Sequence, residues 1–335
     1  MAHIGALING DGFLLAPHEK HEMVEGEPRA DDVVFPYLVG KDLTSWPDQT
    51  PRRFAIDFRD WPLERAETYP SPMAVVRRQV LPHRLKVVRK AYRDRWWQFA
   101  ERQEKMRDAV AGLDSVLVGP RTTKHWSVSF VPQGWIYSSE TIVFSCADPG
   151  HAAVLSSSFH DGWARKYSGS LQTGLRYSPT DCFENFPFPA ALDSLHEVGD
   201  RYLSHRKATM LDQDQGLTTV YNRVHEQPED DHSAIAELRS LRCELDRAVA
   251  DAYGWAGLEL AHDFRETPLG LRYTIDEPTK VEALDRLLEL NHERHAEEVA
   301  RGLHDGKQKK PRRPRTPEAP PASQPGGGGR LFADG

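Results

Sequence analysis

Residues 126–146 have the sequence WSVSFVPQGWIYSSETIVFSC, and this stretch decides the fold class. From Trp126 to Phe130 apolar residues alternate with serines, as on a strand that buries one face. Pro132-Gln133-Gly134 predicts a turn, and two more apolar runs follow at 135–137 and 141–144. We therefore predict a β-meander in this part of the chain.

The segments on both sides of the meander are predominantly helical in pattern. Residues 71–113 have helical periodicity that Pro82 must break or kink, and residues 31–70 suggest short strands and loops. After the meander, apolar residues recur every four positions from Leu155 to Tyr167, and Gly169 can end that helix. We predict a mixed α/β domain over residues 1–190.

Residues 191–305 have a different pattern, with three successive apolar stripes of helical spacing. We predict an all-α domain there, which makes the fold class α+β overall. Residues 306–335 are rich in Pro, Lys, Arg and Gly, and are predicted to be a disordered tail because they cannot bury enough apolar surface.

The composition excludes several classes of protein. Mean hydropathy is −0.61 and no run of about 18 apolar residues occurs, so no membrane span or secretion signal is expected, and we predict a cytoplasmic protein. The three cysteines are far apart and have no CxxC spacing, so neither a zinc site nor a disulfide framework is expected.

The net charge of −7 conceals an uneven distribution along the chain. Residues 1–70 have a net charge of −6, whereas residues 77–124 carry thirteen basic and five acidic side chains. Residues 191–305 are again acidic, with a net charge of −12. One basic block therefore lies between acidic ones, and this block is where a polyanion would bind.

Motifs for catalysis are absent from the sequence. An adenine methyltransferase needs a glycine-rich turn and an Asn/Asp-Pro-Pro-aromatic loop, but Pro320-Pro321 is the only Pro-Pro pair. His292-Glu293-Arg294-His295 is one residue short of the spacing that places two histidines on one helix face, so a solvated face is the better interpretation. We predict no catalytic residue, metal or cofactor in this chain.

The basic block contains candidate phosphate contacts. Arginines and lysines alternate with Tyr92, Trp96, Trp97 and Phe99 on helical segments, and such a strip can neutralise phosphates. A solvated helix pair with its tryptophans in the core explains the same pattern, and these residues alone do not decide between the two. The candidates are Arg84, Lys86, Arg89, Arg93 and Arg121.

Two polar loops, 119–125 and 169–177, contain the candidate base contacts. Arginine can pair bidentately with guanine and glutamine with adenine, so Gln172 and Arg176 suit base readout on a scaffolded loop. Capping and turn formation are the alternative roles for these residues.

The order of several motifs resembles the target-recognition domain of MmeI-like, single-chain type II restriction-modification enzymes. The resemblance extends over about residues 10–300. It is carried by Phe35–Leu43, Asp57–Leu63, Arg95–Phe99, Lys124-His125, Trp163–Arg165, Leu175–Glu184, Phe186–Pro189, Leu217–His225, Leu245–Trp255 and Leu287–Arg294.

This resemblance implies recognition of double-stranded DNA. It places the loops around Lys124-His125 and Gln172–Tyr177 near base edges, so the expected base contacts are Lys124, His125, Gln172, Thr173, Arg176 and Tyr177. In the family a nuclease and an N6-adenine methyltransferase precede this region, and S-adenosylmethionine and Mg²⁺ are implied only for those parts. We expect a truncated chain, a split subunit or a fragment, with a methyltransferase or nuclease subunit in trans as an open alternative.

Two other hypotheses compete with DNA recognition. The chain could be a complete catalytic subunit with an unrecognised active site, which the missing motifs disfavour. It could also be a non-catalytic protein, derived from such an enzyme, that binds a methyltransferase subunit instead of DNA. Methyl-transfer and cleavage assays would decide the first, and duplex binding at low salt would decide the second.

Overall fold

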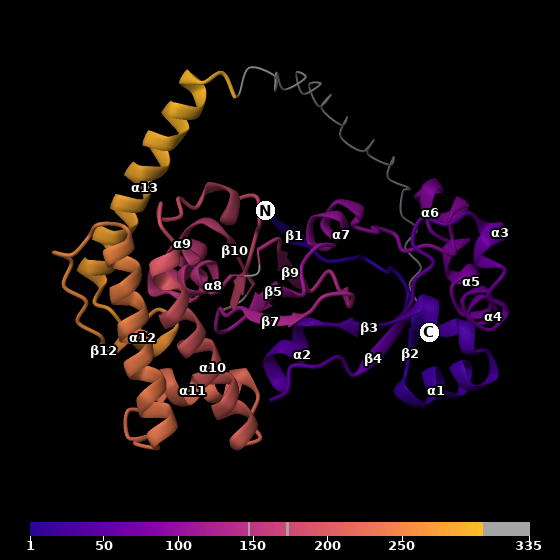
Figure 1. Ribbon diagram of the computed structural model, residues 1–335, viewed down its shortest axis with the longest axis horizontal. Helices are drawn as coiled ribbons and strands as arrows, with labels where there is room; N and C mark the ends of the chain where they lie inside the picture. Colours follow the sequence, from indigo (N-terminus) through magenta and orange to yellow (C-terminus); the bar gives the residue numbers. More distant parts are fainter. Residues whose placement is uncertain (147, 172–173, 304–335) are drawn as a thin grey trace, which may run out of the picture. The chain divides into compact units, whose positions relative to one another are not determined.

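The computed structural model describes residues 1–146, 148–171 and 174–303. Residues 1–292 form one compact unit, and a second unit begins at Glu293, of which residues 293–303 are described. The mixed α/β class is confirmed, because the first unit contains four small sheets and many helices (Figure 1). The domain boundary at 190 stays a prediction, and the expected tail at 306–335 lies outside the described residues.

An antiparallel sheet with the strand order β1-β9-β5-β7 lies between two apolar layers. The alternation of side chains along β5 explains this position, because Leu117 faces the largest apolar cluster while Val116 and Val118 belong to another. The strands are β1 (Ala2–Ile4), β5 (Ser115–Pro120), β7 (Ser129–Pro132) and β9 (Thr141–Phe144).

A second four-stranded sheet has the order β2-β4-β3-β8, and its β3 and β8 run parallel. It packs in a third apolar cluster that also contains residues of α4. The strands are β2 (Leu14–Leu15), β3 (Val34–Leu38), β4 (Arg53–Ile56) and β8 (Ile136–Tyr137).

Three strands lie within the expected meander, but the first begins at Ser129 instead of Trp126, and the three do not pair with one another. β7 and β9 lie on either side of β5, and β8 pairs with β3 in the other sheet. A simple meander is therefore replaced by strands that join two sheets. Sequence patterns cannot reveal this because alternation fixes which face is buried, not which strand is the neighbour.

Helices of the N-terminal half are short, and the predicted break near Pro82 is present. Pro82 lies in the first turn of α5, where its missing N–H costs no helical hydrogen bond. These helices are α1 (Pro17–Gly26), α2 (Gly40–Ser45), α3 (Leu63–Ala66), α4 (Pro70–Gln79), α5 (Leu81–Arg84), α6 (Lys90–Asp94) and α7 (Glu104–Val110), with 3-10 turns η1 (Asp11–Phe13) and η2 (Pro28–Val33).

The longer helices follow residue 148. The predicted helix around 155–167 is two helices, because Ser157 ends α8 and caps α9, where its Oγ accepts a hydrogen bond from the backbone N of His160 at 3.2 Å. The elements are α8 (Pro149–Ser156), α9 (Ser158–Tyr167), η3 (Phe183–Asn185), η4 (Asp193–Leu195), α10 (His196–Asp212), α11 (Leu217–Glu226), α12 (Ser233–Ala252) and α13 (Glu277–Ala300).

One element of the C-terminal segment departs from the prediction of helices alone. β12 (Asp263–Thr267) and β13 (Gly270–Thr274) form a hairpin that closes at Gly270, whose φ of 87° favours glycine. β13 packs against α11, so this hairpin is part of the first unit.

Two buried polar groups connect the helices to the rest of the unit. Arg206 of α10 donates to the carbonyl of Val128 at 2.6 Å and to Ser129 Oγ at 2.9 Å. The Asp246 carboxylate on α12 accepts a hydrogen bond from the backbone N of Ser158 at 2.7 Å and another from His262 at 2.7 Å. The helices of residues 191–292 are therefore bonded to the first 190 residues through groups that only a folded chain brings together.

Helices α8 and α10 pack closely at Gly199, and two separate glycine-to-alanine substitutions test this contact. A Cβ atom at Gly199 would lie 2.3 Å from the carbonyl O of Pro149, whereas a Cβ at Gly162 of α9 would have no neighbour nearer than 3.7 Å. Gly199→Ala is expected to destabilise the fold by about 1–3 kcal/mol through overpacking. The control Gly162→Ala should be neutral or stabilising by up to about 1 kcal/mol, because alanine favours helix. Urea unfolding measures both, and equal effects would contradict the packing described.

The Asp246–His262 pair predicts a loss of stability in alkali. Burial alone would lower the pKa of His262, but the Asp246 carboxylate, with a smaller contribution from Cys243, outweighs burial and raises it from 6.5 to about 9. A raised folded-state pKa stabilises the fold fully below pH 6.5, and this contribution of about 3 kcal/mol is lost as the pH rises through 9. Urea unfolding between pH 6 and 10 should show this loss in the unaltered protein and in the surface control His18→Gln. His262→Gln should lack it, and an unchanged pH profile in His262→Gln would refute the assignment.

Candidate nucleic-acid interface

The two polar loops predicted from the sequence form one structure. β6 (Thr122–Thr123) pairs with β11 (Gly174–Arg176), which also pairs with β10 (Gly169–Leu171). The backbone N of Tyr177 continues the pairing by donating to the carbonyl of Arg121 at 2.8 Å. Loops separated by about fifty residues of sequence are thus joined in a three-stranded sheet, which we call the recognition sheet.

Side-chain alternation on β11 turns Arg176 outward. Leu175 is buried while Arg176 is exposed, as expected for neighbours on a strand. Arg176 and Arg121 line the same surface hollow of about 480 Å³, which also includes Thr180 and Glu184. Burial lowers the pKa of Arg121, and the charge of Arg176 lowers it further. Asp181 and Glu184 line the same hollow, so its two guanidinium groups lie beside two carboxylates.

Lys124 directly follows β6 and is exposed, as Thr122 and Arg176 are. Its side chain is 42% exposed, and its Nζ lies 2.7 Å from Glu226 and 2.9 Å from the Oδ1 of Asn222, both on α11. The ammonium group is therefore held in place and partly neutralised. A ligand that replaced Glu226 would gain a positioned cation.

His125 does not face solvent, which corrects its prediction as a base contact. It is 3% exposed, its Nδ1 accepts a hydrogen bond from Arg272 at 2.6 Å, and its Nε2 lies 2.8 Å from Asn222 Oδ1. Burial and then the charge of Arg272 lower the pKa of His125 to about 4, so the ring is neutral at pH 7. Both ring nitrogens are used within the protein, and neither remains for a base.

Tyr177 is also buried, and its prediction is corrected in the same way. Its ring stacks on Trp126 with centroids 4.1 Å apart, and its Oη lies 3.0 Å from the Nε2 of the buried His160. Because strand alternation that exposes Arg176 must bury Tyr177, the two cannot both read bases. Gln172 and Thr173 lie outside the described residues.

Arg84 is the clearest correction in the basic strip. The side chain is fully buried, and its Nη2 donates to the carbonyls of Ile8 at 2.7 Å and Gln98 at 3.1 Å. It therefore cannot contact phosphate. Its role is to satisfy backbone carbonyls from two separate segments, a use of arginine that depends on its several N–H groups.

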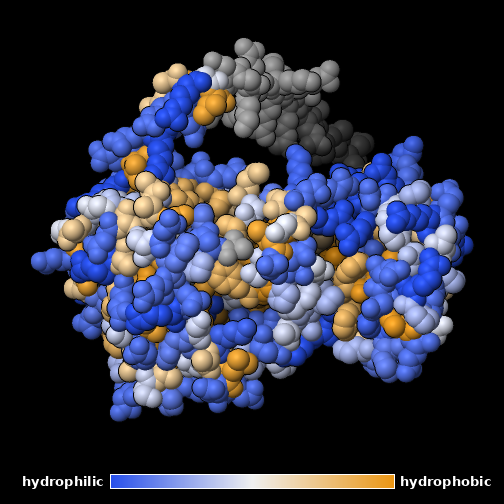
Figure 2. Space-filling model, in the orientation of Figure 1, coloured by the Kyte–Doolittle hydropathy of each residue, from blue (hydrophilic) through white to orange (hydrophobic). Residues whose placement is uncertain are grey.

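The other basic residues of the strip differ in how available they are. Lys86 is exposed, and Arg89 is 62% exposed although it pairs with Glu101 at 2.9 Å. Arg93 is half-buried and donates to the carbonyls of Val87 and Val88, so part of its guanidinium is already used. Figure 2 shows hydrophilic residues over most of the face formed by these helices, at the right of the view. Lys86 and Arg89 are the most accessible cations of the predicted set in this strip.

Sequence reasoning missed two residues that organise the site. Arg165 of α9 pairs with Asp161 at 2.9 Å and donates to the carbonyl of Lys124 at 3.1 Å, which fixes the loop beside the recognition sheet. Arg272 lies on β13, a strand that was not predicted. Arg165 could have been noticed because it belongs to the Trp163-Ala164-Arg165 motif, but no pattern pointed to Arg272.

The described residues offer no obvious metal site. Within residues 1–146, 148–171 and 174–303, no three His, Cys, Asp or Glu side chains are grouped so that they could hold a metal ion. In the same part of the chain, no helix is long and apolar enough to cross a membrane.

Comparisons with known proteins agree with this architecture. Residues 2–190 match the family model of the MmeI target recognition domain. The fold is similar to a solved structure of the type IIL restriction-modification enzyme MmeI in complex with DNA, with a TM-score of 0.65 and 19% sequence identity. That match covers 88% of this chain and 35% of the other, so this chain spans about a third of the length of its match. No curated protein sequence matches this chain.

Proposed function

Because this chain belongs to the family of MmeI target recognition domains, we propose that it recognises a specific sequence of double-stranded DNA for a restriction-modification enzyme. The observation that carries the proposal is the recognition sheet, which joins the two polar loops and leaves Arg176 and Lys124 exposed on them. The resemblance predicted from the motifs is confirmed by the family match, and DNA recognition is the step added here.

Base readout falls to the recognition sheet in this proposal. Arg176 has a planar donor fork that can pair with the N7 and O6 of guanine, and it stands on a regular strand that fixes its direction. Lys124 is proposed as the second residue that reads a base, and Gln172 and Thr173, which lie outside the described residues, are proposed as further ones. His125 and Tyr177 support the sheet from its buried side.

The proposed phosphate contacts are Lys86, Arg89 and Arg121. Arg93 contributes only the N–H groups that its hydrogen bonds to the carbonyls of Val87 and Val88 do not use. Such contacts set affinity and register but carry no sequence information. The strong acidity of residues 191–305 argues against extensive phosphate contact there, because like charges repel.

Methyl transfer and cleavage are assigned to protein outside this chain, since its sequence has no Asn/Asp-Pro-Pro-aromatic loop. A methyltransferase or nuclease subunit in trans is the partner that this assignment calls for, and S-adenosylmethionine and Mg²⁺ would bind to that partner. A cytoplasmic location and a role in phage defence belong to the same proposal, because restriction-modification systems act on DNA inside bacterial cells.

Arg176→Ala is expected to relax specificity at one base pair. Discrimination at that position should fall by about 1–3 kcal/mol, while affinity for unrelated duplexes changes little, because a bidentate base contact is lost. Arg176→Lys is the matched variant, since it keeps the charge but lacks the fork, and it should lose the same discrimination. Competition binding with single-base-pair variants of the preferred duplex measures both. If Arg176→Ala lowered the affinity for all duplexes equally, Arg176 would not be a base-reading residue.

Arg89→Ala is expected to weaken binding to all duplexes alike and to reduce the slope of log affinity against log salt by about 1. Arg201→Ala is the control, because Arg201 is 48% exposed and pairs with Glu244 much as Arg89 pairs with Glu101, yet lies in the acidic segment. Fluorescence anisotropy across a salt series gives both slopes. If the slope of Arg89→Ala equals that of Arg201→Ala, Arg89 is not a phosphate contact.

A further inference from the structure

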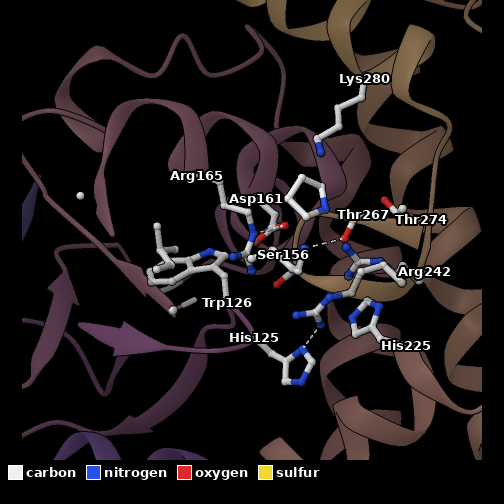
Figure 3. A pocket seen from close by; sticks show the side chains of 16 residues that line it. His125, Trp126, Ser156, Asp161, Arg165, His225, Arg242, Thr267, Thr274 and Lys280 are labelled. Carbon is white, nitrogen blue, oxygen red and sulfur yellow. Dashed lines mark hydrogen bonds and ion pairs between the residues drawn. The ribbon is translucent and has the colours of Figure 1, made fainter. Parts of the chain in front are cut away.

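A cavity of about 410 Å³ lies behind the recognition sheet, apart from the exposed face of Arg176. Its walls come from segments far apart in sequence, namely α9, α11, α12, β13 and α13, and the labelled side chains surround one hollow (Figure 3). The polar and charged residues lining it are His125, Ser156, Asp161, Arg165, His225, Arg242, Thr267, Arg272, Thr274 and Lys280.

The cavity has more positive than negative charge. Arg165, Arg242, Arg272 and Lys280 line it, whereas Asp161 is its one lining carboxylate among the described residues. Burial opposes ionisation of Asp161, but Arg165 and then Arg242 outweigh burial and lower the pKa of its carboxyl group. Asp161 is therefore charged, and it forms an ion pair with Arg165.

Carboxylates outside the lining balance these cations only in part, and one of them, Glu277, lies 3.5 Å from the Nζ of Lys280. Glu226 lies 3.8 Å from Arg272 but 2.7 Å from Lys124, and so serves two cations. Asp246 accepts hydrogen bonds from His262 and from Ser158 N. Burial lowers the pKa of Arg272, and the charge of Arg165 lowers it further, as crowded cations require. The group therefore retains an excess of positive charge.

Several polar atoms of the cavity wall lack partners within the described protein. Arg242 Nε, Arg272 Nε and Ser156 Oγ are buried and make no hydrogen bond, and each residue is more than nine-tenths buried. The wall of the cavity therefore contains polar groups whose hydrogen-bonding capacity the described protein does not use. His125 and His225, which stack at 5.3 Å, both have lowered pKa values and add no charge.

We propose that this cavity binds the phosphate group of a nucleotide. Guanidinium groups and a lysine ammonium suit phosphate oxygens, and two or more cations match the charge of a phosphate monoester. The volume lies within the range of small-molecule sites. Trp126, Leu175, Pro268 and Leu269 supply an apolar wall for the base or sugar. This site is separate from the exposed face of Arg176, which the proposed function uses for base readout.

The phosphate could belong to a free nucleotide or to a DNA strand, because both present the same ester oxygens. Binding to the full chain is measured by isothermal titration calorimetry with inorganic phosphate, deoxyadenosine 5′-monophosphate and adenosine. We expect the two phosphates to bind and adenosine not to bind. A saturating duplex separates the sources: loss of nucleotide binding identifies the DNA backbone as the occupant, and unchanged binding identifies a free nucleotide.

Variants locate the binding in the cavity. Lys280→Gln and Arg165→Lys alter partly exposed side chains, and Arg165→Lys keeps the charge beside Asp161, so both should fold. Each is expected to weaken nucleotide binding about tenfold through loss of a charge-assisted contact. The control Lys207→Gln, at an exposed position of α10 outside the cavity wall, should bind like the unaltered protein.

The proposal is overturned if neither phosphate ligand binds at millimolar concentration and low salt, if adenosine binds as well as the nucleotide, or if all three variants bind alike. A second test uses the unaltered protein and follows the imidazole resonances of the two histidines in the cavity wall. The imidazole resonances of His125 and His225 should shift when inorganic phosphate is added, and constant resonances under saturating phosphate would place the ligand elsewhere.

Discussion

The backbone pairing between β6 and β11 is the interaction on which the rest of the site depends. Two ladder positions, Leu175 opposite Thr123 and Arg176 opposite Thr122, hold together loops that are about fifty residues apart in the chain. The stacking of Tyr177 on Trp126 fixes the register, since a slip by one residue would expose Tyr177 and bury Arg176. The same constraint that buries the ring of Tyr177 therefore leaves Arg176 exposed.

Some of the basic residues of this protein are buried, and this changes how charge is distributed over its surface. Four of the thirteen basic residues in 191–305 are buried, namely Arg206, Arg239, Arg242 and Arg272, so the surface of that segment is more acidic than its sequence total indicates. The buried arginines satisfy backbone carbonyls, as Arg206 does for Val128, or line the internal cavity. A polyanion is thereby directed away from the acidic helices and toward the recognition sheet and the basic strip.

Local patterns predicted local structure well and predicted long-range partners poorly. The helix break near Pro82 and the presence of three strands within 126–146 agree with the prediction, although the first strand begins at Ser129, because alternation and a missing N–H act over a few residues. Whether Arg84 is exposed depends on carbonyls of Ile8 and Gln98, and the burial of Tyr177 depends on His160, which no local pattern encodes. The β12–β13 hairpin was missed because its strands carry many charged residues, although Gly270 marked the turn. The motifs thus identified the two loops, while the fold decided which of their side chains are free.

If this chain selects a DNA sequence, selection from a pool of random duplexes will reveal the preferred one. The full chain is incubated with the pool at moderate salt, and the bound duplexes are recovered and sequenced over several rounds. The account predicts enrichment of one short motif, retained when unrelated duplex is added in excess, because specific binding exceeds non-specific binding by about a thousandfold or more. Absence of any enriched motif from a folded chain, or absence of duplex binding even at low salt, would contradict it and would favour a protein that binds a methyltransferase subunit instead of DNA.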